Sequence, residues 1–221
     1  MSERMRWIRP PQQKRSRDKL DRMLDAAEAL LDKKNFDEVT IAQIAKKARV
    51  SVGLFYTRFD DKDALLSAMY EQHMVELRAT TAKMFDPERW SAVSVTQFIE
   101  ELVAFMVRFH RRKRGLLRAL VLRHHSHPGR RYEDPAERTK TAIASVGRFL
   151  ATRADEIRHS DPRLAGSLGF LFVLGALREK ILFSEGAASA LRISDKRLAK
   201  ELTTAFLGYL GLSKQHSEDQ R

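Results

Sequence analysis

Apolar residues recur at intervals of three and four positions along almost the whole chain, which is the period of an amphipathic helix. The first such stripe consists of Leu20, Met23, Leu24, Ala27, Leu30 and Leu31. A second, shorter stripe runs from Ile41 to Ala48. Turn residues are sparse, with 10 Gly and 6 Pro, and no Asn-Gly or Asp-Gly pair indicates a hairpin. The pattern therefore predicts an all-α fold.

Helix starts are marked by side chains that can satisfy unpaired backbone N–H groups. The segments 40–43 (TIAQ) and 94–97 (SVTQ) have the capping-box pattern. Asp134-Pro135 and Asp161-Pro162 each place a capping carboxylate before a proline at the first helical position. These signals predict nine helices, over residues 17–33, 40–47, 51–57, 61–84, 92–113, 115–126, 135–159, 162–184 and 195–210.

The charge balance points to an anionic partner. Lys and Arg number 41 and Asp and Glu 29, so the formal net charge is +12. Nucleic acid is the first candidate for such a partner and an anionic membrane surface the second, while solubility alone is the lesser alternative. The chain has no Cys, which excludes disulfides, thiolate zinc sites and cysteine nucleophiles.

The two ends and the longest apolar run bear on localisation. Residues 1–15 are basic and broken by proline, without the apolar stretch of a secretion signal. We expect them to form a flexible arm that either enters a DNA minor groove or is simply solvated. The apolar run 164–177 is too short for a membrane span. We expect a cytoplasmic protein with no membrane partner and a disordered tail over 213–221.

One segment has the spacing of a helix-turn-helix. Two short predicted helices, 40–47 and 51–57, are separated by only three residues. Ala45 is small where the helices must approach closely, and Val50 and Phe55 can fill the core between them. In such a motif the second helix enters the DNA major groove. The pattern alone also fits an ordinary helical hairpin in a bundle.

The residues of this segment carry a resemblance to a known family. Residues 24–66 resemble the DNA-binding domain of the TetR family of bacterial transcriptional regulators. The matching features include Ala26-Ala27 in the first helix, Val39-Thr40 and Ile44-Ala45 around the second, 50–56 (VSVGLFY) across the turn, and Lys62 after Phe59. The resemblance covers the N-terminal third, and the rest agrees in length and helical content only.

Two positions depart from the family pattern. Arg49 stands in the turn where the family usually has Gly, although such a turn position often requires a positive φ that costs other residues energy. Arg49 would then need a strained or slightly different turn, and it could add a phosphate contact. Asn35 replaces another common Gly, and Asn tolerates the left-handed conformation.

The resemblance implies which side chains touch DNA. The residues that correspond to the family's contacts are Thr40, Ser51, Val52, Gly53, Leu54, Tyr56, Thr57, Arg58 and Lys62. The basic N-terminal arm adds Lys14, Arg15 and Arg17 as further candidates. Only Val52, Leu54 and Arg58 suit base readout, and the others would position the protein on phosphates. Each could instead belong to a solvated helix face.

The resemblance further implies a domain organisation in which residues 16–62 bind DNA. Residues 63–212 would then form a helical bundle for ligand binding and dimerisation. Small and apolar residues on the last two predicted helices suit an interface between two copies, namely Gly169, Phe172, Gly175, Ala176, Leu202, Phe206 and Tyr209. The same residues would also suit a core within one chain.

A small, largely apolar effector is the ligand that this resemblance and the central helices suggest. The candidate pocket residues are Met74, Phe105, Met106, Phe109, Leu117, Phe149, Phe170 and Arg178. The basic stretch 108–131 could bind an anionic end of the ligand, tune DNA affinity, or remain a solvated face. An ordinary packed core would produce the same Met and Phe content.

We therefore expect a homodimeric regulator that leaves a near-palindromic DNA operator when an effector binds. Of the two roles, we favour a repressor over an activator. The chain lacks the nucleophile-elbow, P-loop and dinucleotide motifs, so we expect no enzyme and no cofactor. The alternatives are an all-α enzyme or metal sensor built on His124, His125 and His127, or a DNA-binding regulator without a small-molecule effector. Adjacent histidines on a helix point about 100° apart, which disfavours a shared metal.

Overall fold

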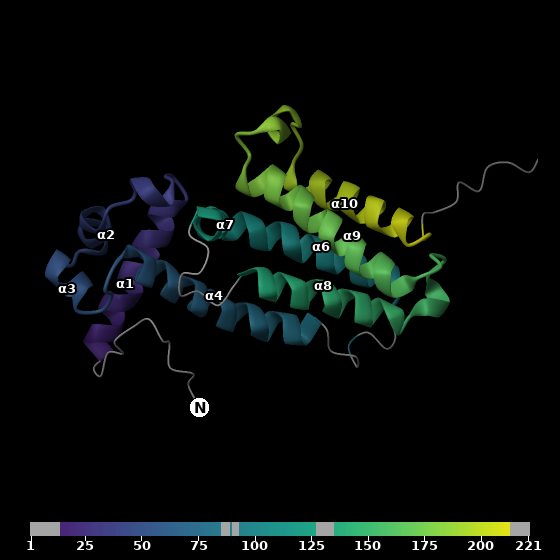
Figure 1. Ribbon diagram of the computed structural model, residues 1–221, viewed down its shortest axis with the longest axis horizontal. Helices are drawn as coiled ribbons and strands as arrows, with labels where there is room; N and C mark the ends of the chain where they lie inside the picture. Colours follow the sequence, from purple (N-terminus) through teal and green to yellow (C-terminus); the bar gives the residue numbers. More distant parts are fainter. Residues whose placement is uncertain (1–13, 85–88, 90–92, 127–134, 213–221) are drawn as a thin grey trace, which may run out of the picture. The chain divides into compact units, whose positions relative to one another are not determined.

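The computed structural model describes residues 14–84, 89, 93–126 and 135–212, and within these ranges it is helical without strands (Figure 1). The nine α-helices expected from the sequence are present in this part of the chain. They are α1 (Lys14–Leu31), α2 (Ile41–Ala48), α3 (Val52–Tyr56), α4 (Lys62–Met84), α6 (Val95–Arg112), α7 (Arg114–Ser126), α8 (Pro135–Ala151), α9 (Pro162–Leu177) and α10 (Asp195–Tyr209). Three short 3-10 helices lie between the α-helices, η1 (Phe36–Glu38), η2 (Ala154–Glu156) and η4 (Ala187–Ala190). A short π-helix, η3 (Arg178–Leu182), directly continues α9.

The predicted helix caps are confirmed wherever the structure describes them, although α1 begins at Lys14 rather than at 17 and α6 at Val95 rather than at 92. The capping boxes of Thr40 with Gln43 and of Ser94 with Gln97 are both formed. The Asp161 carboxylate accepts a hydrogen bond from the Leu164 N–H at 2.9 Å. Asp134 lies outside the described residues. The starts were predictable because each cap lies within a few residues of the N–H group it satisfies.

Two predicted helix ends are wrong. The helix expected over 135–159 ends at Ala151, because the following residues bond to the start of α6 instead. Arg153 donates to the Val93 carbonyl at 2.5 Å, and Glu156 accepts from the Val95 N–H at 2.8 Å. The helix expected over 162–184 is α-helical only to Leu177 and continues as the π turn η3. Such turns are often found at functional positions.

The chain divides into two compact units. The first contains the described residues up to Thr81 together with 113–135, and the second contains 82–112 and those from 136 onward. This division differs from the expected boundary after Lys62. Most of α4 and all of α7 pack into the same core as the helix-turn-helix, so they belong to its unit.

Helix α7 is joined to α1 and α4 by close packing and ion pairs. A Cβ at Gly115 would lie 2.5 Å from the carbonyl carbon of Leu31, so only glycine permits this approach of α7 to the end of α1. Further along α7, the Arg123 guanidinium binds both carboxylate oxygens of Asp63, at 2.8 and 2.6 Å. Arg123 also lies over the Phe36 ring at 5.4 Å. Such two-point pairing fixes orientation as well as distance.

The second unit is a bundle of α6, α8, α9 and α10, which run alongside one another in Figure 1. Gly147 of α8 packs against α9, where an added Cβ would lie 2.2 Å from the Ser167 Oγ. An ion pair between Arg111 and Asp195, at 2.8 Å, joins the end of α6 to the start of α10. His110 is buried in α6, and this burial lowers the pKa of its imidazole despite a hydrogen-bond contact of Nδ1 with the Met106 carbonyl.

Candidate nucleic-acid interface

The start of α2 presents an exposed, capped backbone turn. The Thr40 Oγ1 accepts a hydrogen bond from the Gln43 N–H, and the Gln43 side chain accepts one from the Thr40 N–H, both at 3.2 Å. The opposite face of α2 is buried through Ile44, Ala45 and Ala48. Thr40 is therefore held in a defined position while its side chain remains exposed.

Helix α3 is short, and buried aromatic residues hold it in place. The Ser51 Oγ caps it by accepting from the Leu54 N–H at 3.1 Å. The side chains of Phe55 and Phe59 are 0% and 1% exposed, and their rings lie 5.2 Å apart. The other side of the helix is open, with Val52 42% exposed and Tyr56 50% exposed.

The remaining members of the predicted reading surface divide into outward and inward residues. Gly53 and Thr57 are exposed, and Leu54 is half-buried. The Thr57 hydroxyl donates to the Leu54 carbonyl at 2.7 Å, so it is engaged in its own turn. The surface of α3 that is open to a major groove is therefore small and largely apolar.

Arg58 is oriented differently from the expectation that it reads bases. Its guanidinium donates a hydrogen bond to the Ser16 Oγ near the start of α1, and the side chain is half-buried. This contact joins the end of the recognition segment to a helix 42 positions earlier in the chain. In this conformation the guanidinium supports the scaffold, and base readout by Arg58 would require it to leave Ser16.

Lys62 also points into the protein rather than outward. Its ammonium donates to the carbonyls of Phe36 and Val39 at 2.6 and 2.8 Å, and it lies 4.4 Å from the centre of the Phe36 ring. Burial lowers the pKa of Lys62 from its ordinary value, and Arg123 adds to this shift while carboxylates oppose it. In this conformation the ammonium of Lys62 caps the turn η1.

The turn between α2 and α3 has the left-handed geometry that glycine favours. Arg49 has φ 55° and ψ 49°. Among the described residues it is the only non-glycine residue with a positive φ. Its N–H donates to the Lys46 carbonyl and the Val50 N–H donates to the Ala45 carbonyl, which together end α2. Asn35, by contrast, has φ −68°, so it does not use the left-handed conformation that Asn tolerates.

The basic start of α1 is described only in part. Arg17 is exposed, whereas the structure describes the backbone but not the side chains of Lys14 and Arg15. The predicted arm over 1–15 lies outside the described residues except for Lys14 and Arg15, whose backbone begins α1. Arg17 is the one of these three side chains that can be placed on the surface.

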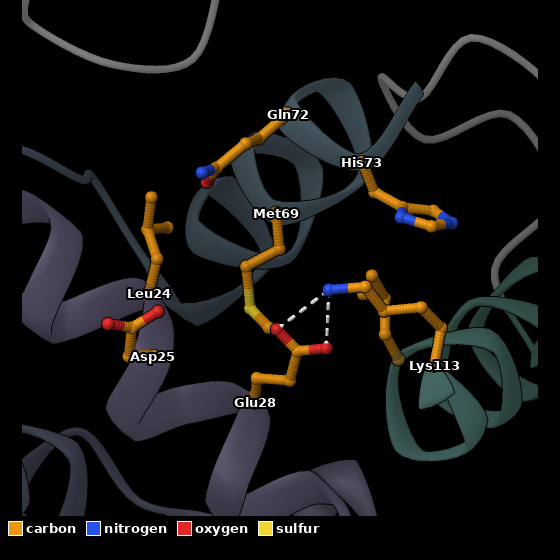
Figure 2. A pocket seen from close by; sticks show the side chains of 8 residues that line it. Leu24, Asp25, Glu28, Met69, Gln72, His73 and Lys113 are labelled. Atoms are coloured by element: carbon orange, nitrogen blue, oxygen red, sulfur yellow. Dashed lines mark hydrogen bonds and ion pairs between the residues drawn. The ribbon is translucent and has the colours of Figure 1, made fainter. Parts of the chain in front are cut away.

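A small polar recess lies between α1, α4 and α7 (Figure 2). The Lys113 ammonium binds both oxygens of Glu28 across it, at 2.7 and 3.1 Å, and His73 is buried beside it. Its volume of about 90 Å³ is far below the roughly 300–1,000 Å³ of a drug-sized ligand site. None of the predicted effector residues lines it. This ion pair could not be predicted from the sequence, because Glu28 and Lys113 are 85 positions apart.

The predicted effector residues fall into both units. Met74 and Leu117 belong to the first unit, where Met74 is buried in the helix-turn-helix core. The other six belong to the second unit. There Met106 and Phe170 are buried, and the half-buried Phe105 and Phe109 stack at 5.7 Å. Arg178 is exposed and lies 5.5 Å from the Phe183 ring.

The predicted dimer residues also divide into buried and exposed groups. Gly169 and Phe206 pack against each other within one chain, since a Cβ at Gly169 would lie 2.1 Å from the Phe206 ring. This pair fills the core of the second unit and offers no surface to a partner. Phe172 is 55% exposed, and Gly175 is exposed with no atom within 4 Å of its Cβ position. The remaining three, Ala176, Leu202 and Tyr209, are half-buried.

The histidine alternative finds no support in the described part of the chain. His124 is half-buried on α7, whereas the His125 side chain and His127 lie outside the described residues. Among the residues that were placed, no group of three His, Cys, Asp or Glu is arranged to hold a metal. The described helices also include none with the length and apolar character needed to cross a membrane.

A capped α2, a left-handed turn and an outward-facing α3 define a helix-turn-helix DNA-binding protein. Residues 23–69 match the family described as bacterial regulatory proteins, tetR family, and residues 94–210 match the tetracyclin repressor-like C-terminal domain. The second match alone covers more than half of the chain. The protein therefore belongs to the TetR family of DNA-binding transcriptional regulators, as the resemblance of residues 24–66 predicted.

A curated relative is similar over part of the chain. The Transposon Tn10 TetC protein of Escherichia coli is 36% identical over 72 residues, which cover 32% of this chain and 36% of that protein. The match thus spans about a third of the relative's length.

Solved structures share the fold over most of the chain. A putative TetR-family regulator from Mesorhizobium loti MAFF303099 is 22% identical, with a TM-score of 0.67 over 90% of this chain and 98% of that one. NalD of Pseudomonas aeruginosa, the secondary repressor of the MexAB-OprM efflux pump, is 19% identical, with a TM-score of 0.58 over 92% and 100%. FadR of Bacillus subtilis, solved with stearoyl-CoA, is 14% identical, with a TM-score of 0.59 over 86% and 98%.

The inward position of Lys62 predicts a mainly structural effect of its removal. Lys62→Met keeps the aliphatic stem but leaves the Phe36 and Val39 carbonyls without a charged donor. We expect a loss of about 1–3 kcal/mol in the free energy of unfolding, measured by urea denaturation. The salt dependence of DNA binding should stay unchanged, and Lys34→Met, at an exposed lysine, serves as the control. A variant of unchanged stability whose DNA binding has a flatter salt dependence would instead make Lys62 a phosphate contact.

Proposed function

We propose that the protein is a dimeric, ligand-responsive repressor that acts in the cytoplasm on a near-palindromic operator. The observation that carries this proposal is the presentation of α3, whose Val52 and Tyr56 face outward while Phe55 and Phe59 anchor it. Two such helices in a dimer would enter successive turns of the major groove. Thr40 and Ser51 would bind phosphates, whereas Val52 and Leu54 would contact thymine methyl groups.

Selection of duplexes from a random pool, followed by affinity measurements, tests this assignment. We expect log K to fall steeply with log salt, because each phosphate contact contributes a slope of about −0.9. Val52→Ala and Leu54→Ala should change the selected bases, at a cost of about 1–3 kcal/mol at the affected position. Tyr56→Phe should weaken binding to all duplexes alike. Absence of any selected sequence, or identical base preferences for wild type and both alanine variants, would refute the proposed readout.

We propose that the dimer interface is the exposed face of α9, rather than all seven of the predicted interface residues. Leu164 and Leu171 are 53% and 45% exposed, and Phe172 and Gly175 extend the same apolar surface. Large apolar residues clustered on one exposed helix support burial against a second copy. Tyr209 of α10 lies beside this face, with its ring 5.6 Å from that of Phe172.

A charge placed on this face should separate the subunits. In Gly175→Arg the new Cβ has no atom within 4 Å, so the fold should be retained while a bulky charge enters the interface. Analytical ultracentrifugation should show a wild-type dimer at micromolar concentration and a variant monomer with unchanged circular dichroism. Lys200→Glu, at an exposed position of α10, is a control for altered charge. A monomeric wild type, or a Gly175→Arg variant that remains dimeric, would contradict this surface.

We also propose that a largely apolar effector binds within the second unit. Five of the candidate residues there are aromatic or Met side chains of α6, α8 and α9, and Phe149 stacks on Phe98 at 4.3 Å. Met and Phe side chains adapt to apolar ligands of irregular shape. The stearoyl-CoA bound to FadR of B. subtilis supports a long acyl chain as the first probe.

Release from the selected duplex measures this response. Stearate and stearoyl-CoA are added to the complex, with free coenzyme A as the matched control. An effector must bind the DNA-incompetent state more tightly, and we expect it to lower the affinity for the duplex by about 5- to 150-fold. Phe109→Ala should reduce this response more than it reduces DNA binding. Equal affinity with and without both acyl probes would remove the acyl-chain proposal while leaving the DNA-binding assignment intact.

A further inference from the structure

Three basic residues lie next to one another at the end of α2, and their charged groups are not paired with other groups in the described part of the protein. Lys46, Lys47 and Arg49 are all exposed. In the described part of the molecule, none of the three makes an ion pair or hydrogen bond through its side chain. Arg58 and Lys62 differ, because the first binds Ser16 and the second binds the η1 carbonyls. The positive charge of the helix-turn-helix that remains available to a partner therefore lies at this end of α2.

The same segment is free of negative charge. From Val39 to Phe59 the sequence contains no Asp or Glu. Carboxylates stand before it at Asp37 and Glu38, and after it at Asp60 and Asp61. An anion that approaches α2, the turn or α3 thus meets cations without a competing carboxylate in the segment itself.

Arg49 occupies its position at a backbone cost. Its left-handed conformation is one that glycine adopts freely and that other L-residues adopt with strain. Basic side chains interact favourably with the end of a helix, but Lys46 and Lys47 already lie in the last turn of α2. Strained residues of this kind cluster at functional sites, so the conformation of Arg49 points to a role that glycine would not fulfil.

Arg49 is also close to the start of the recognition helix. Two peptide units separate it from Ser51, so their Cα atoms lie no more than about 7.6 Å apart. A helix in the major groove has a phosphate backbone on each side, and the groove is about 12 Å wide. The long Arg49 side chain therefore starts beside the groove edge whenever α3 enters the groove.

We propose that Arg49, with Lys46 and Lys47 beside it, forms a second phosphate-binding surface that grips the DNA backbone next to the recognition helix. This inference rests on the proposed DNA-binding function and adds a contact at a turn position whose left-handed conformation glycine would adopt more easily. The surface contacts phosphates only, so it increases affinity for every sequence without selecting bases.

Arg49→Gly tests the proposed phosphate-binding surface, because it should raise the stability of the protein and at the same time lower its affinity for DNA. Glycine relaxes the left-handed turn, so the thermal midpoint should rise by a few degrees. Affinity for the duplex selected by the wild type should fall roughly tenfold for each subunit bound, and therefore about a hundredfold for the dimer, as expected for loss of one charged hydrogen bond per subunit. The slope of log K against log salt should flatten by about 0.9 for each subunit bound. A scrambled duplex should lose affinity by the same factor.

Three variants complete the design. Arg49→Lys retains the charge and should keep most of the affinity, whereas Arg49→Asn tolerates the left-handed turn but should bind as weakly as Arg49→Gly. Lys196→Gln removes one exposed cation from α10 and should leave the salt slope unchanged. An Arg49→Gly protein with the wild-type slope, or one that loses affinity together with stability, overturns the proposal. A wild type that selects no duplex and binds none overturns the proposed function instead.

Discussion

The burial of Phe55 and Phe59 is the constraint on which the DNA-reading surface depends. Helix α3 has five residues, whereas an isolated helix needs about 12–15 to be even marginally stable in water. Its shape must therefore come from the core, in which both rings are almost fully buried. Because Val52 and Tyr56 are four positions apart, they share the face opposite these rings. The packing that makes α3 a helix also determines which side chains it presents.

That core is completed by a distant part of the chain. Leu116 and Leu120 of α7 are buried in the same cluster as Phe55, and Gly115 allows α7 to approach the end of α1. The DNA-reading unit is thus assembled from the chain before residue 82 and the chain after residue 112. The segment between them contains α6, on which the proposed effector residues Phe105 and Phe109 lie. Lys113, the first residue after α6, is paired with Glu28 of α1 within the first unit.

Features that depend on residues nearby in the chain could be predicted from the sequence, whereas features that depend on distant residues could not. The all-α class, the caps of Thr40 and Ser94 and the outward position of Tyr56 follow from helical spacing and from residues within a few positions. The orientations of Arg58 and Lys62 could not be predicted, since their partners lie 42 and 26 positions away. The early end of α8 has the same cause, because Arg153 and Glu156 bond to residues about 60 positions earlier. Small residues such as Gly169 indicate close helix contact without showing whether the second helix belongs to the same chain.

The use of positive charge in the first unit shows why a net charge of +12 does not by itself define an interface. Lys62 and Arg58 are cations by composition, yet the protein's own carbonyls and a hydroxyl group occupy them. On α1, partial burial raises the pKa of Asp21, and the nearby carboxylates of Asp25 and Asp18 add to this shift. What distinguishes the segment from Val39 to Phe59 is that its exposed cations are unengaged and no carboxylate accompanies them. Net charge increases the attraction of any polyanion, whereas the distribution of unneutralised charge determines which face meets it. In this protein that face includes the turn that leads into the recognition helix.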